Sequence, residues 1–297
     1  MGKRLFSEHK PAKDVFLEVD NALDRKLSKI IFEGSDSELT KTFNTQPALM
    51  AVSLAIIRVI ESELDKKISS FVDIVAGHSL GEYSALCAIN SIDLEDTARI
   101  LELRGKSMQQ CVKSFPTKMT AVMGMEIKDI EKSLFSEPDN ICEIANDNCP
   151  GQAVISGHES AVDKTKETCK KNGARALIDL KVSAPFHCSL MQPAADSMQA
   201  AFESISIKKP DIKFINNVNA DFESNPSIIK NLLVQQVVNK VRWRESIKLI
   251  YSAGVTSIFE IGSGKVLTGL NKRMNIGCDF SNIEEFNEIK TFLEKLT

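Results

Sequence analysis

The sequence predicts an α/β fold in two parts, a large domain with a parallel sheet and a smaller domain inserted into it. Two observations carry this prediction. A short apolar run at residues 71–76 is followed by a G-x-S-x-G at residues 77–81 and by helix formers at residues 82–88. Between residues 119 and 182 the expected order is strand, helix, strand, strand, helix, strand.

The G-x-S-x-G lies in the strand, tight turn and helix context of a nucleophile elbow. Glycines must flank Ser79 because the turn is sharp and its central residue is strained. Ser79 would then stand at the N-terminus of a helix, where the Leu80 N–H and the helix dipole stabilise an oxyanion. An ordinary serine in a βα turn is the alternative, and the flanking segments favour the elbow. We therefore expect an α/β-hydrolase-like large domain at residues 1–118 and 183–297.

The remaining elements of the large domain follow in chain order. Residues 11–27 form an amphipathic pattern with apolar residues on one face, which predicts a helix. Pro47 stands near the expected start of the next helix, which is apolar almost all round to residue 59 and so belongs in the core. Later helices are expected at 189–205, 227–239, 247–253 and 265–274, with a strand at 255–261.

A buried arginine is expected on the helix that Asp93 caps. This helix should run to about Val112, and Arg104 falls on its apolar face. A guanidinium on a buried face needs a partner. The partner is either a structural carboxylate such as Glu82 or the carboxylate of a substrate, which a guanidinium holds through two hydrogen bonds.

The inserted segment, residues 119–182, has the element order of a ferredoxin-like domain. Its pattern predicts strands at 120–125, 141–145, 152–156 and 174–182, with helices at 127–136 and 161–172. The second helix stops at Gly173, a residue that commonly ends helices.

Composition excludes several classes of protein. A net charge of −3 gives no indication of nucleic-acid binding, and the longest apolar run, residues 47–57, is too short to span a bilayer. Seven cysteines without a C-x-x-C pattern suggest neither a disulfide framework nor a zinc site. We expect a monomeric cytoplasmic protein with reduced thiols.

A nucleophilic serine needs a base, and His187 is the best candidate among four histidines. It lies in an expected loop between a strand and a helix, where catalytic residues of α/β scaffolds are common. His78 adjoins Ser79, but adjacent side chains diverge on an elbow. No Asp or Glu stands out as the third member of a triad.

Several segments together resemble the malonyl-CoA:acyl carrier protein transacylases, the acyltransferases of fatty-acid synthesis. The segments, in the family's order, are NTQPA at 44–48, GHSLGEYSAL at 77–86, RGK at 104–106, PGQ at 150–152, FHC at 186–188 and EIG at 260–262 through Gly269. The resemblance covers nearly the whole chain. It implies that Arg104 holds the malonyl carboxylate and that His187 is the base, oriented by the backbone carbonyl of Gln236.

The resemblance also implies a reaction. Ser79 takes the malonyl group from malonyl-CoA and passes it to the phosphopantetheine thiol of acyl carrier protein, with Leu80 N–H at the oxyanion. A thioester is already activated, so no metal or tightly bound cofactor is expected. Phe186, next to the base, should crowd a branch on the acyl α-carbon and disfavour methylmalonyl.

Members of this family usually begin with an apolar strand and a G-Q-G-S-Q-like loop, whereas Met1 opens here on a polar segment. We expect the lack of that strand and oxyanion donor to impair this form, or the stated start to be too late. Two other functions stay open. One is a serine esterase or thioesterase of α/β-hydrolase type, and the other is an impaired protein that only binds acyl carrier protein.

Overall fold

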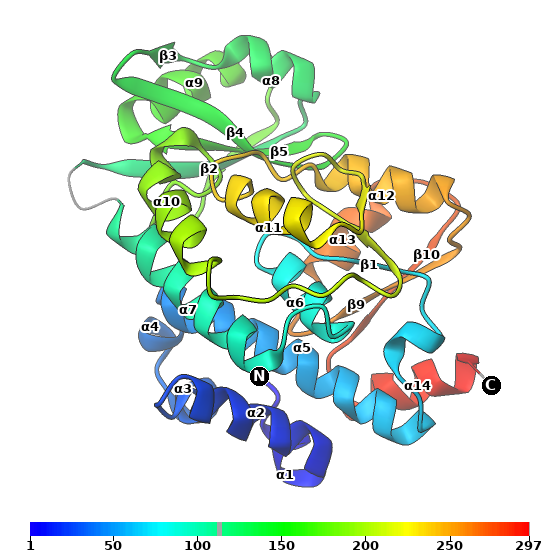
Figure 1. Cartoon of the computed structure of the whole chain (residues 1–297). Coiled ribbons are helices and arrows are strands. Elements are labelled where there is room, and N and C mark those ends of the chain that lie inside the picture. The colour runs from blue at the N-terminus through cyan, green and yellow to red at the C-terminus, as the bar shows by residue number, and fades with distance from the viewer. Residues whose placement is uncertain (112–114, 297) are drawn as a thin grey trace.

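The computed structural model describes residues 1–111 and 115–296, and it divides into a helix-rich large part and a smaller sheet-containing part (Figure 1). The helices of the large part are α1 (Lys3–Glu8), α2 (Lys10–Ala22), α3 (Leu27–Glu33), α4 (Asp36–Leu39), α5 (Thr42–Leu64), α6 (Gly81–Ala88), α7 (Leu94–Gln110), α10 (Gln192–Ala201), α11 (Pro226–Gln235), α12 (Trp243–Ser252), α13 (Val266–Lys272) and α14 (Phe286–Leu296), with 3-10 turns η1 (Ile68–Ser70) and η2 (Ser189–Met191). The α/β class expected from the sequence is confirmed.

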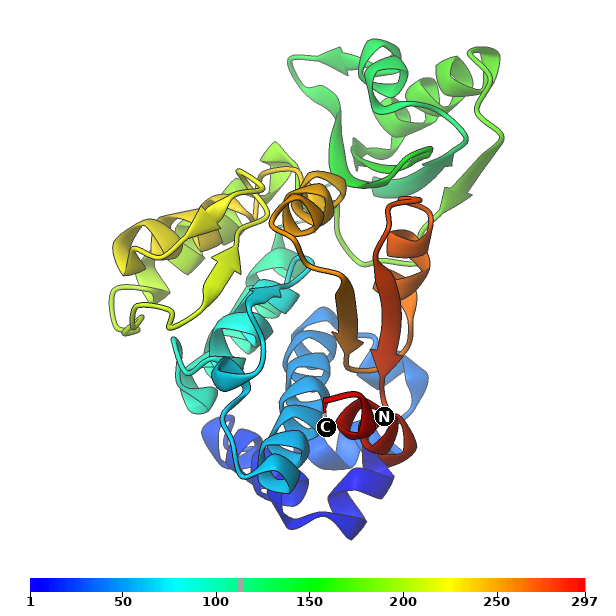
Figure 2. The same cartoon turned by 90° about the vertical axis from the view of Figure 1, so that its right-hand side faces the viewer.

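The strands of the large part form two separate pieces of sheet. The strand β1 (Ile74–Ala76) pairs in parallel with β7 (Lys213–Ile215), and β7 pairs antiparallel with the short β8 (Phe222–Glu223). The strands β9 (Ser257–Ile261) and β10 (Asp279–Ile283) pair in parallel. Figure 2 shows β9 and β10 side by side, running from the small part towards α14. The expected parallel pairing is therefore present, whereas β7, β8 and β10 carried too little pattern to be predicted.

The helix α5 is the centre of the main hydrophobic core, and α2, α6 and α7 pack around it. It is buried along most of its length because its sequence is apolar on nearly every face. At one crossing α7 approaches very closely, since a Cβ on Gly105 would lie 2.5 Å from the Cα of Phe43. This contact brings the face of α7 that carries Arg104 into the interior.

One expected boundary was wrong. Pro47 is not at the start of α5 but inside it, because hydrogen bonds from Asn44 and Thr45 to the Lys41 carbonyl begin the helix earlier. A proline inside a helix leaves the carbonyl four residues before it without its usual donor. That carbonyl, on Phe43, accepts a hydrogen bond from Arg25 at 3.4 Å. The expected end of α7, Val112, lies outside the described residues.

The small part is a five-stranded antiparallel sheet of order β3-β4-β5-β2-β6, with the helices α8 and α9 packed against it. Its elements are β2 (Thr117–Met123), α8 (Ile127–Ser133), β3 (Ser136–Glu137), β4 (Asn140–Cys149), β5 (Gln152–His158), α9 (Glu159–Lys171) and β6 (Ala176–Asp179). Without the two-residue β3, this is the expected ferredoxin-like order. The domain limits 119–182 stay a prediction, and β2 begins slightly before them.

Contacts with α12 and the segment before it tie the small part to the large one. Asp147 on β4 donates its N–H to the carbonyl of Val241 at 2.9 Å, and its carboxylate accepts a hydrogen bond from Arg244 at 2.8 Å. The sheet face opposite α8 and α9 carries a second apolar cluster that includes Met119 and Val154 and packs against Phe186. Phe186 lies directly before His187, so this face borders the predicted site.

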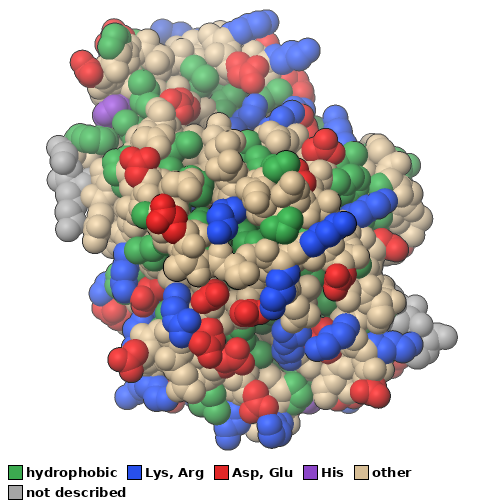
Figure 3. Space-filling model, in the orientation of Figure 1, with side chains coloured by type: hydrophobic (Ala, Val, Ile, Leu, Met, Phe, Trp, Pro, Cys, Tyr) green, Lys and Arg blue, Asp and Glu red, His purple; other side chains and the backbone are tan. Residues whose placement is uncertain are grey.

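The surface carries both signs of charge. On the face shown in Figure 3, acidic and basic side chains are interspersed, in keeping with the small net charge of −3. None of the described helices is both long enough and apolar enough to cross a bilayer.

Candidate active site

Ser79 stands on the expected sharp turn between β1 and α6. Its φ is 56°, in the left-handed region that non-glycine residues rarely adopt. A Cβ on Gly77 would lie 1.9 Å from the backbone carbon of Gly81, so only glycine allows the turn to close. Among the described residues, the Leu80 N–H has no hydrogen-bond partner and is available to an oxyanion.

Asn217 holds the turn from the neighbouring strand. It follows the carboxyl end of β7, which lies beside the carboxyl end of β1 because the two strands are parallel. Its Oδ1 accepts a hydrogen bond from the Ser79 N–H at 2.7 Å, and its Nδ2 donates to the Gly77 carbonyl at 2.7 Å. These two bonds satisfy the backbone on both sides of the turn. Asn217 was not predicted from the sequence, because β7, the strand that it follows, carried too little pattern to be recognised.

His187 contacts the serine directly. Its Nε2 lies 2.8 Å from the Ser79 Oγ, and its Nδ1 lies 2.8 Å from the backbone oxygen of Gln236. A carbonyl oxygen only accepts hydrogen bonds, so Nδ1 carries the proton and Nε2 accepts from the serine hydroxyl. Within residues 1–111 and 115–296 no carboxylate contacts Nδ1, and the pair is arranged as a dyad.

Burial keeps His187 neutral. Removal from water and the nearby positive charge of Arg104 lower the pKa of His187 from 6.5 to about 3. The imidazole is therefore in its basic form at neutral pH. Its backbone is also unusual, with a φ of 60° in the left-handed region.

Arg104 lies beside the same hydroxyl. One Nη atom donates to the Ser79 Oγ at 3.1 Å and to the Gln236 Oε1 at 2.8 Å, and the other donates to the Gln46 Oε1 at 2.7 Å. The side chain is 1% exposed, and its Nε has no hydrogen-bond partner among the described residues.

The proposed structural partner, Glu82, does not pair with Arg104 directly. It acts on the guanidinium only at longer range, and Gln236 lies between them. The acceptors that contact the guanidinium are thus neutral oxygens. A buried guanidinium whose contacting acceptors are all neutral can still bind an incoming carboxylate.

Two further candidates lie near the dyad in different ways. Phe186 is half-buried and packs between the core of the large part and the sheet of the small part. His78 turns away from Ser79: its Nε2 lies 3.0 Å from the Asn148 Oδ1, and its ring packs near Trp243. The structure thus brings Ser79, His187, Arg104 and Gln236 together, with Phe186 at the border.

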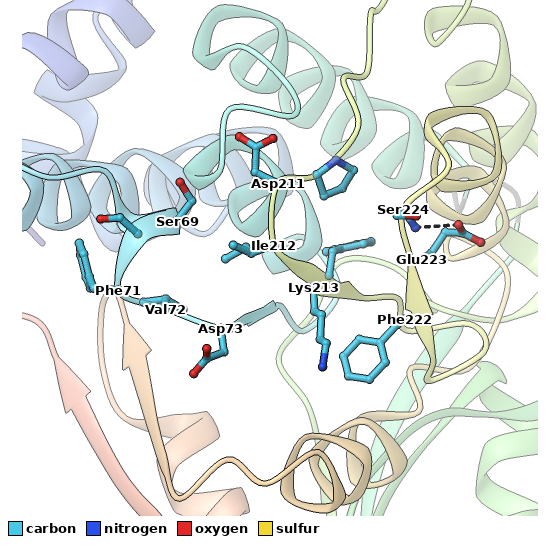
Figure 4. Close-up of a pocket in the computed structure, with 13 residues that line it drawn as sticks. Ser69, Phe71, Val72, Asp73, Asp211, Ile212, Lys213, Phe222, Glu223 and Ser224 are labelled. Atoms are coloured by element: carbon cyan, nitrogen blue, oxygen red, sulfur yellow. Dashed lines mark hydrogen bonds between the residues drawn. The ribbon is translucent and has the colours of Figure 1, made fainter.

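An open pocket of about 700 Å³ lies away from this constellation (Figure 4). It is lined by residues that precede β1 and β7 and by β8, with Lys213 extending over the ring of Phe222. The pocket thus lies at the amino ends of the parallel strands β1 and β7, whereas Ser79 follows the carboxyl end of β1. Among the residues that the structure covers, no group of three or more His, Cys, Asp or Glu side chains is placed to hold a metal ion.

Comparisons with known proteins identify the family to which the chain belongs. Residues 1–271 match the sequence profile described as an acyl transferase domain. The chain belongs to the acyl transferase domain family. This places the elbow and its dyad in a family whose members transfer acyl groups.

Individual acyl transferases are similar along nearly the whole chain. A malonyl CoA-acyl carrier protein transacylase of Bacillus subtilis is 41% identical, with 93% of this chain and 86% of the relative covered. The Escherichia coli protein of that name is 39% identical, covering 95% and 90%. Among solved structures, an acyl-carrier-protein-S-malonyltransferase from Bartonella henselae is 48% identical with a TM-score of 0.96, covering 100% and 94%.

A further solved structure holds an acyl transferase with its protein partner. It is a malonyl-transacylase in complex with a type II PKS acyl-carrier protein, 36% identical to this chain with a TM-score of 0.94, covering 99% of this chain and 94% of the other.

Proposed function

We propose that this protein transfers the malonyl group of malonyl-CoA to the phosphopantetheine thiol of acyl carrier protein, through a malonyl ester of Ser79. The observation that carries the proposal is the 3.1 Å contact between the Arg104 guanidinium and the Ser79 Oγ inside a buried site. A nucleophile beside a buried cation suits an acyl group that ends in a carboxylate. The similar transacylases named above support the same substrate.

In the first half of the reaction, the Ser79 Oγ attacks the thioester carbon of malonyl-CoA, and its proton passes to the Nε2 of His187. The Leu80 N–H donates to the oxyanion of the tetrahedral intermediate, aided by the N-terminus of α6. The C–S bond then breaks, and the CoA sulfur takes the proton from His187. This leaves free CoA and malonyl-Ser79.

The second half reverses these roles. The thiol of the carrier protein gives its proton to His187 and attacks the ester carbon of malonyl-Ser79. The Ser79 oxygen leaves and recovers the proton, and the malonyl group is now a thioester of the carrier. The Gln236 carbonyl keeps the Nδ1 of His187 protonated throughout, so that Nε2 alone exchanges protons.

Specificity would come from two side chains. Arg104 binds the free malonyl carboxylate and orients the thioester towards Ser79. Phe186 adjoins the base and would crowd a substituent on the acyl α-carbon, so methylmalonyl should be a poorer substrate. The reaction needs no metal or tightly bound cofactor, because a thioester is already activated. The monomeric state and the cytoplasmic location stay predictions, which light scattering and cell fractionation test.

The experiment is incubation of the full chain with malonyl-CoA, followed by intact mass measurement and then by addition of acyl carrier protein. A malonyl adduct that is absent in Ser79→Ala and that moves to the carrier supports the proposal. Release of free malonate without transfer would instead indicate a thioesterase. Binding of the carrier protein without any adduct would indicate a protein that only binds it.

A further inference from the structure

Glu82 is a buried carboxylate that the reaction described above does not use. It lies in the first turn of α6, three residues after Ser79, and is 1% exposed. One carboxylate oxygen accepts a hydrogen bond from the Asn217 backbone N–H, and the other accepts from the Gln236 side-chain amide. Both oxygens therefore face donors, which is the arrangement that an ionised carboxylate satisfies.

The two partners of Glu82 reach both halves of the dyad. Asn217 bonds the backbone on either side of the elbow, as described above. Gln236 donates from its Nε2 to the Ser79 carbonyl at 2.8 Å, and its own carbonyl accepts the Nδ1 proton of His187. A single carboxylate thus links the loop after β7 to the end of α11, and through them it links the nucleophile to its base.

A neutral side chain of the same shape does not satisfy this site. Glutamine has one acceptor and one donor at its end, so its NH₂ would meet either the Asn217 N–H or the Gln236 amide. Glu82 also brings negative charge near Arg104, whose contacting acceptors are neutral. The charge offsets part of the cost of burying that guanidinium while leaving its donors available.

We propose that Glu82 is a positioning residue of the transfer reaction, whose ionised carboxylate holds Asn217 and Gln236 so that the Ser79 Oγ and the His187 Nε2 stay in contact. The transfer itself rests on the function proposed above, but the positioning of Ser79 does not depend on the acyl donor. The simpler alternative is that Glu82 only stabilises the fold.

The two roles differ in their pH dependence. Burial raises the pKa of Glu82 to about 8, against the opposing effects of its hydrogen bonds and of Arg104. Arg104 from α7 and Tyr83 from α6 are the titratable groups that act on Glu82, and burial also raises the pKa of Tyr83. His187 stays neutral because its pKa is lowered to about 3. A loss of Ser79 reactivity below about pH 8 therefore reports protonation of Glu82 and not of the base.

The test uses Glu82→Gln in the full chain and a serine reagent that is independent of malonyl-CoA. Phenylmethanesulfonyl fluoride sulfonylates the Oγ: an S–O bond forms, fluoride leaves, and the hydroxyl proton passes to His187. The rate of adduct formation is followed by intact mass between about pH 6 and pH 9. Asp20→Asn is the matched control, since Asp20 is buried like Glu82, with 2% exposed, and its carboxylate accepts two hydrogen bonds from Ser28.

Glu82→Gln should react about 10- to 100-fold more slowly than the wild type at the pH optimum. It should also lose the acid limb of the pH profile, which is the fall in rate towards low pH. Asp20→Asn should keep both the wild-type rate and the acid limb. Reaction within twofold of the wild type, or an unchanged acid limb, would overturn the proposal. If Glu82→Gln does not fold, Glu82→Asp replaces it, because it keeps the carboxylate but draws it back from the two donors by one methylene. Slow reaction then supports the proposal, and reaction at the wild-type rate overturns it. Failure of wild-type protein to accept malonyl-CoA while still reacting with the sulfonyl fluoride would refute only the proposed substrate.

Discussion

Replacement of Arg104 by alanine separates substrate recognition from structure. The guanidinium contacts Ser79 and two glutamines, and no carboxylate pairs with it among the described residues. If it binds the malonyl carboxylate, its loss leaves that charge unpaired in a buried site, which costs about 3–5 kcal/mol. At about 1.4 kcal/mol per factor of ten, kcat/KM for malonyl-CoA should fall by roughly two to three and a half orders of magnitude. Acetyl-CoA has no free carboxylate and should lose far less.

The same substitution has a structural cost that must be measured beside the kinetics. It removes donors from Gln46 and Gln236, and an unsatisfied buried acceptor costs about 1–3 kcal/mol. Arg104→Lys keeps the positive charge near Glu82 but not the two-pronged geometry, so its malonyl activity should be intermediate.

Arg25→Ala supplies the control, because Arg25 binds Glu102 and Asn44 away from the serine. It should lower the melting temperature without changing the ratio of malonyl to acetyl turnover. The assay is steady-state transfer to acyl carrier protein from each CoA ester, with melting followed by circular dichroism. Equal losses for malonyl-CoA and acetyl-CoA in Arg104→Ala would show that the arginine is structural.

Three other outcomes are expected. His187→Ala should slow acylation of Ser79 by about 10²- to 10⁴-fold, the usual loss for a general base, and a loss below tenfold in single-turnover assays would point to another base. Folding stability should fall as the pH drops from 6.5 towards 3, because His187 binds a proton in the unfolded chain at a higher pH than in the native one. Urea titrations at several pH values should show a smaller fall in His187→Ala. Identical pH slopes for the two proteins would contradict the lowered pKa of His187. Gly77→Ala should destabilise the protein and abolish acylation, since its Cβ would meet the Gly81 backbone at 1.9 Å; a folded, active variant would show that the turn is built differently.

Local pattern was sufficient for much of the fold. The elbow follows from glycines on both sides of a serine between an apolar run and a helix, and the ferredoxin-like order follows from strand and helix patterns in sequence. Arg104 was suspected because helical spacing places it on an apolar face of α7, and it is indeed 1% exposed. Each of these features depends on residues close together in the chain, which is why a single sequence contains them. The strands β7 and β10 were missed, since neither has the alternation of apolar and polar residues that marks a strand.

The sequence by itself thus determined the fold class and the nucleophile turn. His187 was a candidate from its loop position, whereas Gln236 was identified only through a family resemblance. The tertiary structure alone decided how these parts meet. The dyad joins residues 108 positions apart, and Asn217 reaches the elbow across 138 positions. Such contacts depend on parallel pairing of β1 with β7 and on how the chain returns past α11. Hydrogen bonds between distant segments leave no periodic trace in either segment, so only the packed molecule shows Glu82 at the centre of the site.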